Sequence, residues 1–229
     1  MKILSFESSS ASASVALTEG TRLIAQSFQN CGLTHSRTLL PMAEALLAGC
    51  GIPPGAVDGF AVAAGPGSFT GIRIGTATVK GLAFGLDRPC VGVSTLEAMA
   101  RGLEGLEGNL CCVMDARAGQ VYNALFTWEG GTLRRLCPDR AIALGALAGE
   151  IGEKSQILVG DGAEMCYTEK RDCCPGLRLA PPHLRYPTGY GVARAALPRF
   201  EAGETVSAQE LDARYLRAPQ AERIRKGEP

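Results

Sequence analysis

The stretch FAVAAGPGSFTG at residues 60–71 runs from an apolar segment through a glycine-rich turn into the segment 70–84. Residues 60–64 predict a strand buried on both faces, and residues 70–84 have the apolar spacing of a helix. A strand, a tight turn and a helix in this order form the repeating unit of α/β folds. The stretch therefore predicts an α/β protein and places a glycine turn at the end of a central strand.

The same order of elements occurs in both halves of the chain. In the first half we expect strands at 3–6, 14–17, 23–27, 60–64 and 89–93 and helices at 34–48, 70–84 and 94–101. In the second half we expect strands at 110–114, 121–127, 132–136 and 157–159 and a helix at 142–151, before the glycine turn at 160–162. Neither half is long enough to bury both faces of its own sheet, so two stacked lobes are expected, residues 1–103 and 104–229. By analogy we infer the actin-like fold of sugar kinases and Hsp70 ATPases, the ASKHA fold.

The end of the chain has weaker periodicity. Residues 171–187 contain four prolines and predict an irregular surface connection, and residues 191–200 predict a last helix. Residues 211–229 mix charges of both signs, which is typical of a solvated end, with a partner contact as the alternative.

Composition limits the classes of function. The 229 residues are 46% hydrophobic and 20% charged, and 23 basic side chains balance 23 acidic ones. This predicts a packed globular protein without a net field that attracts nucleic acid or a membrane. The first residues lack the pattern of a secretory leader and no apolar stretch could span a bilayer, so a cytoplasmic location is expected. The nine cysteines lack zinc-ribbon spacing and are expected to be small buried hydrophobes, with Cys173 and Cys174 exposed beside Pro175.

Candidate chemistry centres on the glycine turn. A turn at a helix N-terminus can hold an anion, so a degenerate nucleotide or phosphate loop would use Gly65, Gly67, Ser68, Thr70 and Gly71. The turn lacks the Lys of a P-loop and the spacing of the dinucleotide fingerprint, and glycines that merely permit a tight turn are an equal alternative.

Other catalytic signatures are missing from the sequence. Glu7 is the best remaining acid, because it follows the first strand. The two histidines, His35 and His183, are expected to be structural or surface residues, and Ser68 has no triad context. No catalytic residue and no metal ligand are therefore assigned.

Several segments together resemble one family. They are GPGSFTGIRIG (65–75), KGLA (80–83), GVSTLE (92–97), HS (35–36), LLPM (39–42), DAR (115–117), VY (121–122), GDGA (160–163) and YLRAPQAER (215–223). With these motifs the chain resembles the bacterial TsaB (YeaZ-like) family, of the group once labelled glycoprotease-like. The chain departs from the family pattern at residues 6–8, where relatives more often have an apolar residue followed by Asp and Thr.

The resemblance implies a function without catalysis. It implies a subunit that pairs with TsaD, the catalytic paralogue, and with TsaE in making N6-threonylcarbamoyladenosine beside the anticodon of tRNA. The His-x-x-x-His metal pair of TsaD corresponds here to Thr95 and Met99, which cannot replace two imidazoles. The resemblance further implies that the chain contacts tRNA only through the complex and forms a homodimer in isolation. It implies no required cofactor, with ATP or ADP binding only at a degenerate site or at a site shared with the complex.

The partner surface is expected on the two helices at 35–47 and 70–84. Its expected residues are His35, Leu39, Met42, Ile72, Arg73, Thr76 and Lys80. The rival hypotheses are an independent ATPase, kinase or glycoprotease-like metallopeptidase, and a direct tRNA-binding module. Zero net charge and the lack of an aromatic and basic patch argue against the last.

Overall fold

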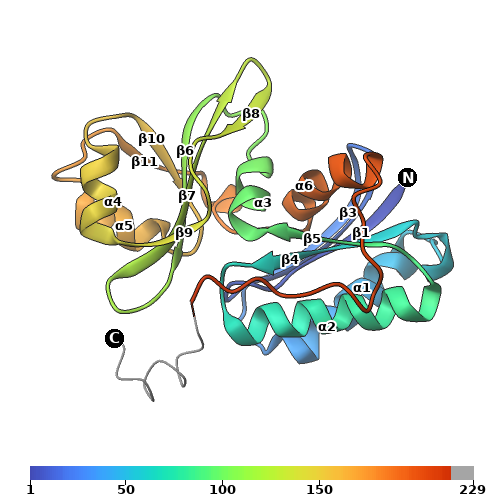
Figure 1. Ribbon diagram of the computed structural model, residues 1–229. Helices are drawn as coiled ribbons and strands as arrows, with labels where there is room; N and C mark the ends of the chain where they lie inside the picture. Colours follow the sequence, from blue (N-terminus) through green and yellow to red (C-terminus); the bar gives the residue numbers. More distant parts are fainter. Residues whose placement is uncertain (218–229) are drawn as a thin grey trace.

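Two β-sheets, each covered by helices on both faces, make up the computed structural model, which describes residues 1–217 (Figure 1). The strands are β1 (Lys2–Glu7), β2 (Ala13–Glu19), β3 (Arg22–Gln29), β4 (Gly59–Gly65), β5 (Cys90–Ser94), β6 (Gly108–Asp115), β7 (Gln120–Glu129), β8 (Thr132–Arg135), β9 (Arg140–Ala143), β10 (Gln156–Val159) and β11 (Leu177–Leu179). The α-helices are α1 (His35–Gly49), α2 (Phe69–Leu86), α3 (Thr95–Arg101), α4 (Leu144–Ile151), α5 (Ala163–Lys170) and α6 (Gly189–Glu201). Short 3-10 turns η1 (Pro54–Ala56) and η2 (Pro182–Leu184) complete the order.

The first sheet has the strand order β3-β2-β1-β4-β5. β1 pairs antiparallel with β2 and parallel with β4, which pairs parallel with β5. Because side chains alternate along a strand, Leu4 and Phe6 pack on the face covered by α1 and α2, and Ile3 packs on the face covered by α6. On that second face, the Ser5 hydroxyl donates to the Gly189 carbonyl over 2.7 Å.

The second sheet has the order β11-β10-β6-β7-β8, with β9 paired to β7. α4 and α5 cover one face through a cluster around Leu147 and Cys166. α3 covers the other face, where the Trp128 indole N–H donates to the Ala100 carbonyl over 2.9 Å. α3 also packs against α6, so it lies between the two sheets (Figure 1).

The predicted elements differ from the observed ones in the second half. The prediction of one helix over residues 142–151 is wrong at its start, because the strand β9 occupies 140–143 and α4 begins after it. α5 was not predicted, since its apolar residues form no clear stripe, and β11 and η2 interrupt the connection at 171–187. α6 follows the second sheet in sequence but packs on β1 and β2 of the first. The division into 1–103 and 104–229 remains a prediction.

The segment at residues 206–217, called the strap below, is held against the first sheet. Val206 and Cys90 exchange backbone hydrogen bonds of 2.9 and 2.8 Å, and the Arg214 N–H donates to the Ala64 carbonyl over 2.7 Å. Leu211 is buried in the core. The predicted solvated end, which began at residue 211, is therefore wrong for Leu211, whereas Asp212, Arg214, Tyr215 and Leu216 are exposed. The later charges of that prediction, at 218–229, lie outside the described residues.

Within residues 1–217, no helix combines the length and apolar character needed to cross a membrane.

Candidate functional site

A cleft of about 850 Å³ with polar and apolar lining lies where the ends of the two sheets meet. Its walls come from the serine turn after β1, the start of α1, the glycine turn after β4, the β6–β7 hairpin, the turn after β10 and the strap. They are lined by Ser9, Ser10, Ala11, residues 32–36, residues 66–72, Ile74, residues 114–117, Tyr122, Asp161 and residues 214–217. The structure thus brings the predicted glycine turn together with both halves of the chain.

The glycine turn is fitted closely against its neighbours. A Cβ on Gly71 would collide with the Ser8 carbonyl oxygen, and a Cβ on Gly67, where φ is +151°, would collide with the Ser9 carbonyl oxygen. The Ser68 N–H donates to that same Ser9 oxygen over 2.7 Å, and the Ser68 hydroxyl caps α2 by accepting from the Gly71 N–H over 3.3 Å. These glycines are required for close backbone approach, and two of the turn's amides already have partners. Phosphate or nucleotide binding at Gly65, Gly67, Ser68, Thr70 and Gly71 stays a prediction.

Two carboxyl groups with raised pKa values lie beside this turn. Glu7, at the end of β1, is fully buried, and its Oε1 accepts from the Ser9 N–H over 2.6 Å and from the Ser9 hydroxyl over 2.5 Å. Its Oε2 has no partner within the described residues. Burial raises the pKa of Glu7 to about 7, and the nearby charge of Asp161 acts in the same direction.

Asp161 follows β10 and accepts from the Asp115 N–H over 3.3 Å. Burial raises the pKa of Asp161 to about 6, with a further contribution from the charge of Asp115. The sequence analysis selected Glu7 but missed Asp161. The strand followed by Gly160-Asp161-Gly162 repeats the first-half pattern and was the signal that could have found it.

The strap closes one side of the cleft. The Tyr215 ring lies 4.8 Å from that of Phe69, and the Arg73 guanidinium stacks 3.8 Å from the Phe69 centroid while its Nε donates to the Tyr215 hydroxyl over 3.0 Å. Arg217 donates to the Ala116 carbonyl in the β6–β7 hairpin over 3.0 Å. The strap therefore contacts the ends of both sheets. The mixed charge of its sequence did not predict these contacts.

The positions that correspond to the TsaD metal pair are packed inside the protein. Thr95 is fully buried at the start of α3, and Met99 is 2% exposed in the apolar cluster between α3 and the second sheet. Within residues 1–217 no group of three potential ligand side chains of the His, Cys, Asp and Glu type comes together in a way that could hold a metal ion.

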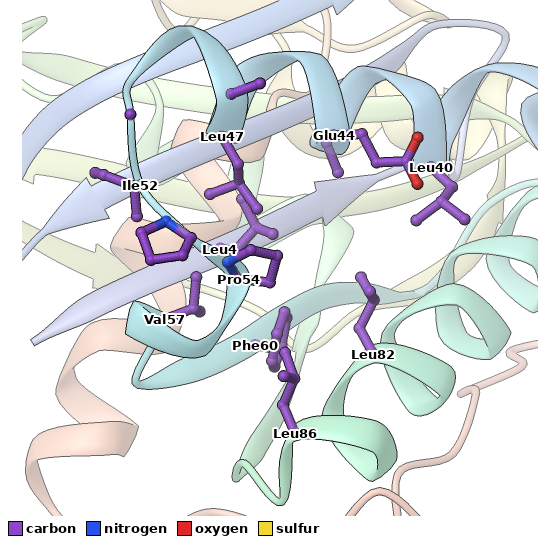
Figure 2. A pocket seen from close by; sticks show the side chains of 14 residues that line it. Leu4, Leu40, Glu44, Leu47, Ile52, Pro54, Val57, Phe60, Leu82 and Leu86 are labelled. Atoms are coloured by element: carbon purple, nitrogen blue, oxygen red, sulfur yellow. The ribbon is translucent and has the colours of Figure 1, made fainter.

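A second, apolar depression of about 540 Å³ lies between α1 and α2, and we call it the groove. Figure 2 shows Leu40 and Leu47 on the α1 side, Leu82 and Leu86 on the α2 side, and Phe60 between them. Among its lining residues, Glu44 is the one with a charged side chain. The groove lies on the two helices for which the sequence predicted a partner surface.

The side chains predicted for that surface need correction. Leu39, Met42, Ile72 and Thr76 are 1–6% exposed, because they point from the helices into the first-lobe interior. His35 binds the Ser10 carbonyl over 2.8 Å, and Arg73 is engaged by Phe69 and Tyr215. Lys80 donates to the carbonyls of Gln209 and Leu211 in the strap over 3.1 and 2.9 Å. Sequence periodicity selected the inward stripe of these helices, and Leu40, at 41% exposure, is on the outward side. A partner surface on the two helices stays a prediction.

Comparison with known proteins agrees with this architecture. A family model described as TsaD, tRNA N6-adenosine threonylcarbamoyltransferase, matches residues 29–170. The tRNA threonylcarbamoyladenosine biosynthesis protein TsaB of Escherichia coli is 30% identical over 228 residues, which cover 95% of each chain. The chain belongs to the TsaB family. The TsaB protein of Bacillus subtilis is 35% identical over 144 residues, 63% of each chain.

Solved structures give the same assignment. YeaZ from Pseudomonas aeruginosa superposes with a TM-score of 0.80 at 28% identity, over 94% of this chain and 99% of that one. Component A of (R)-2-hydroxyglutaryl-CoA dehydratase from Acidaminococcus fermentans superposes with a TM-score of 0.51 at 12% identity, over 89% of this chain and 99% of that one. The second likeness shows the fold alone. The predicted TsaB resemblance and the actin-like α/β fold are confirmed.

Proposed function

We propose that this TsaB-family chain is a non-catalytic subunit that pairs with TsaD and, together with the ATPase TsaE, supports N6-threonylcarbamoyladenosine formation in tRNA. The name of the Escherichia coli relative supports the pathway. The observation that supports pairing is the groove, an apolar surface between α1 and α2 with one charged side chain in its lining. Its floor is made of buried side chains such as Leu47 and Phe60, and Leu40 at its side is exposed. An apolar depression that is open at the surface is typical of a protein interface.

The absence of catalysis in this proposal rests on the buried positions Thr95 and Met99. A hydroxyl and a thioether enclosed by core side chains cannot take the place of two imidazoles open to substrate. TsaD would supply the metal and the transfer chemistry. This chain would supply a surface that positions TsaD, and tRNA would be contacted through the complex.

Pairing is tested by placing a charge in the groove. Leu40→Glu and Leu86→Glu are expected to weaken TsaD binding at least about tenfold, because a carboxylate would lose its water against an apolar partner. Leu136→Glu is the matched control, since Leu136 is 46% exposed, close to the 41% of Leu40, but follows β8 on the second sheet. Binding is measured by calorimetry or pull-down with purified TsaD, and folding by circular dichroism. Normal TsaD binding by both folded groove variants would refute the proposal for this surface.

An independent ATPase is the second candidate, and the observation that favours it is the cleft lined by Asp161 and the glycine turn, with the buried Glu7 bound to Ser9 of its wall. The test is a measurement of ATP turnover by the purified chain alone and by the chain mixed with TsaD, with TsaE or with both. Turnover by the isolated chain that Glu7→Gln abolishes would favour this candidate. Turnover confined to mixtures that contain TsaE would favour the subunit role.

A further inference from the structure

Two neighbouring thiols in the second lobe differ sharply in their surroundings. Cys173, in the turn after α5, is exposed, and its Sγ donates to the Lys170 carbonyl over 3.3 Å. Cys174 is 1% exposed and packs in the cluster between α4, α5 and the second sheet, where its Sγ donates to the Ala148 carbonyl over 3.6 Å. The two sulfur atoms are 3.8 Å apart. The Cys173 thiol is therefore open to solvent, and the Cys174 thiol contacts it from the buried side.

The other cysteines lack this combination. Cys90, Cys111, Cys112 and Cys166 are buried, and burial raises the pKa of each of these four thiols. Such thiols are rarely ionised and are poor at the first attack on an oxidant. Burial also raises the pKa of the Cys174 thiol, so Cys174 serves as the second, resolving thiol and Cys173 as the one that meets the oxidant. Cys31 is exposed and Cys50 and Cys137 are half-buried, but no second sulfur atom is found in contact with any of these three within residues 1–217. A redox-sensitive thiol is typically accessible and adjacent to a second thiol that resolves it, and Cys173 beside Cys174 meets both conditions.

We propose that Cys173 and Cys174 are an oxidative modification site that forms a reversible disulfide between neighbouring residues when the chain meets hydrogen peroxide. The Cys173 thiolate attacks one peroxide oxygen, the O–O bond breaks, and the departing hydroxide takes up a proton to become water. Cys173 is then a sulfenic acid. The Cys174 sulfur attacks that sulfur, the S–O bond breaks, and the departing hydroxide takes the Cys174 proton to become the second water. Two thiols and one peroxide yield one disulfide and two water molecules.

The backbone makes this disulfide easy to reduce. Neighbouring Cα atoms are held about 3.8 Å apart by the peptide, below the roughly 4.4–6.8 Å usual for disulfides. The resulting strain favours the reduced pair whenever a thiol reductant is present, as is typical of regulatory disulfides. The sulfur atoms must also approach from 3.8 Å to about 2.0 Å. The Cys174 sulfur must therefore move away from the Ala148 carbonyl and out of the α4–α5 cluster.

The protein sequence allows a direct test by mass spectrometry. Trypsin cuts after Arg171 and Arg178 and releases both thiols in one peptide, DCCPGLR at residues 172–178. The full-length protein is treated with a small excess of hydrogen peroxide, blocked with N-ethylmaleimide in denaturant so that the buried Cys174 also reacts, and digested without reductant. We expect this peptide to carry no maleimide and to be two hydrogen atoms lighter than the reduced form. Dithiothreitol before blocking should restore a peptide with two maleimides.

Variants separate the two thiols. Cys174→Ser should leave Cys173 as a sulfenic or more oxidised acid, and Cys174→Ala repeats the test should the hydroxyl disturb the buried site. Cys173→Ser should leave Cys174 unoxidised at the same dose, because its sulfur is enclosed. Cys31→Ser is the matched control, which removes an exposed thiol and should leave the disulfide unchanged. Recovery of sulfinic acid on Cys173 with maleimide on Cys174 in the unsubstituted protein would overturn the proposal, as would two maleimides after peroxide.

Discussion

The groove lies in the first lobe and the cleft lies where the ends of the two sheets meet, and their walls are built differently. The groove is lined by aliphatic side chains of α1 and α2, which are joined to the core beneath. The cleft is lined by six segments that carry both polar and apolar groups, and backbone hydrogen bonds such as the one from Ser68 to Ser9 connect segments that are far apart in the chain. A change on the outward side of the groove would alter a surface, whereas a change in the cleft wall would break contacts between distant parts of the chain.

This difference indicates where the chain tolerates substitution. Close backbone approach leaves no volume for an added methyl group in the cleft wall, because protein interiors are packed to the density of organic crystals. The outward face of α2 has open space beside its small residues. A pair of glycines on this one helix, Gly71 and Gly81, makes the comparison direct.

The largest effect is expected for Gly71→Ala. The added Cβ would collide with the Ser8 carbonyl oxygen, whose residue is also held by a 2.9 Å hydrogen bond from its hydroxyl to the Gly71 carbonyl. We expect the free energy of unfolding to fall by about 3 kcal/mol, at the upper end of the range for overpacking. Urea denaturation followed by circular dichroism measures this change.

Gly81→Ala is the control for that prediction. Gly81 lies in α2, and nothing lies within 4 Å of the position of its Cβ. Alanine is favoured over glycine inside a helix by about 1 kcal/mol, so this variant should be as stable as the parent or more so. If both variants lose the same stability, the collision with the Ser8 carbonyl oxygen is not the cause of the loss in Gly71→Ala.

The next effect concerns the buried carboxyl of Glu7. Its pKa is about 7 in the folded chain against an ordinary 4.5, so the folded state holds more protons than the unfolded state between these values. Stability should therefore fall as the pH rises from about 4.5 to about 7 and stay lower above that. Glu7→Gln removes the charge and keeps an acceptor for Ser9, so it should raise stability at pH 8, by at most about 3 kcal/mol.

The measurement for Glu7 is the melting temperature between pH 5 and pH 8. The variant should flatten the decline but leave a smaller slope below about pH 6, because the pKa of Asp161 is raised in the same direction. Glu19→Gln, at the exposed end of β2, should keep the parent's full slope. A Glu7→Gln profile parallel to that of the parent would show that Glu7 is not the group responsible.

Local patterns predicted much of the first lobe. Apolar runs located β1, β2, β4 and β5, because these strands are buried on both faces. Helical spacing located α1 and α2, because each of these helices buries one face. The glycine turn was found for the same reason, since strand, glycine and helix follow one another in the chain. The segments that resemble the TsaB family also led to the family assignment, which the comparisons confirm.

Other features depend on contacts that no local pattern shows. Leu39 and Leu40 are neighbours of the same residue type, and the packing of α1 on the sheet makes one buried and the other exposed. The strap has mixed charge, but Leu211 and Tyr215 fix it through partners more than a hundred residues earlier in the chain. Asp161 lies in the cleft only because β10 pairs with β6 and brings its turn beside Asp115.

The smallest effect is expected for Tyr215, where the strap meets the cleft. Its ring packs 4.8 Å from the Phe69 ring, and aromatic pairs contribute about 0.5–1.5 kcal/mol beyond their buried area. Tyr215→Ala should therefore lower the free energy of unfolding by about 1 kcal/mol, and Tyr215→Phe by less, since it keeps the ring and loses only the acceptor for the exposed Arg73. Because a single variant mixes this contact with others, the decisive measurement is a double-mutant cycle of Tyr215→Ala with Phe69→Ala in urea. A coupling energy of about 0.5 kcal/mol or more would show that the rings hold the strap to the glycine turn. Additive losses would mean that Leu211 and the Arg214 backbone alone fix the strap. The contact between the Tyr215 and Phe69 rings would then contribute nothing to the free energy of unfolding.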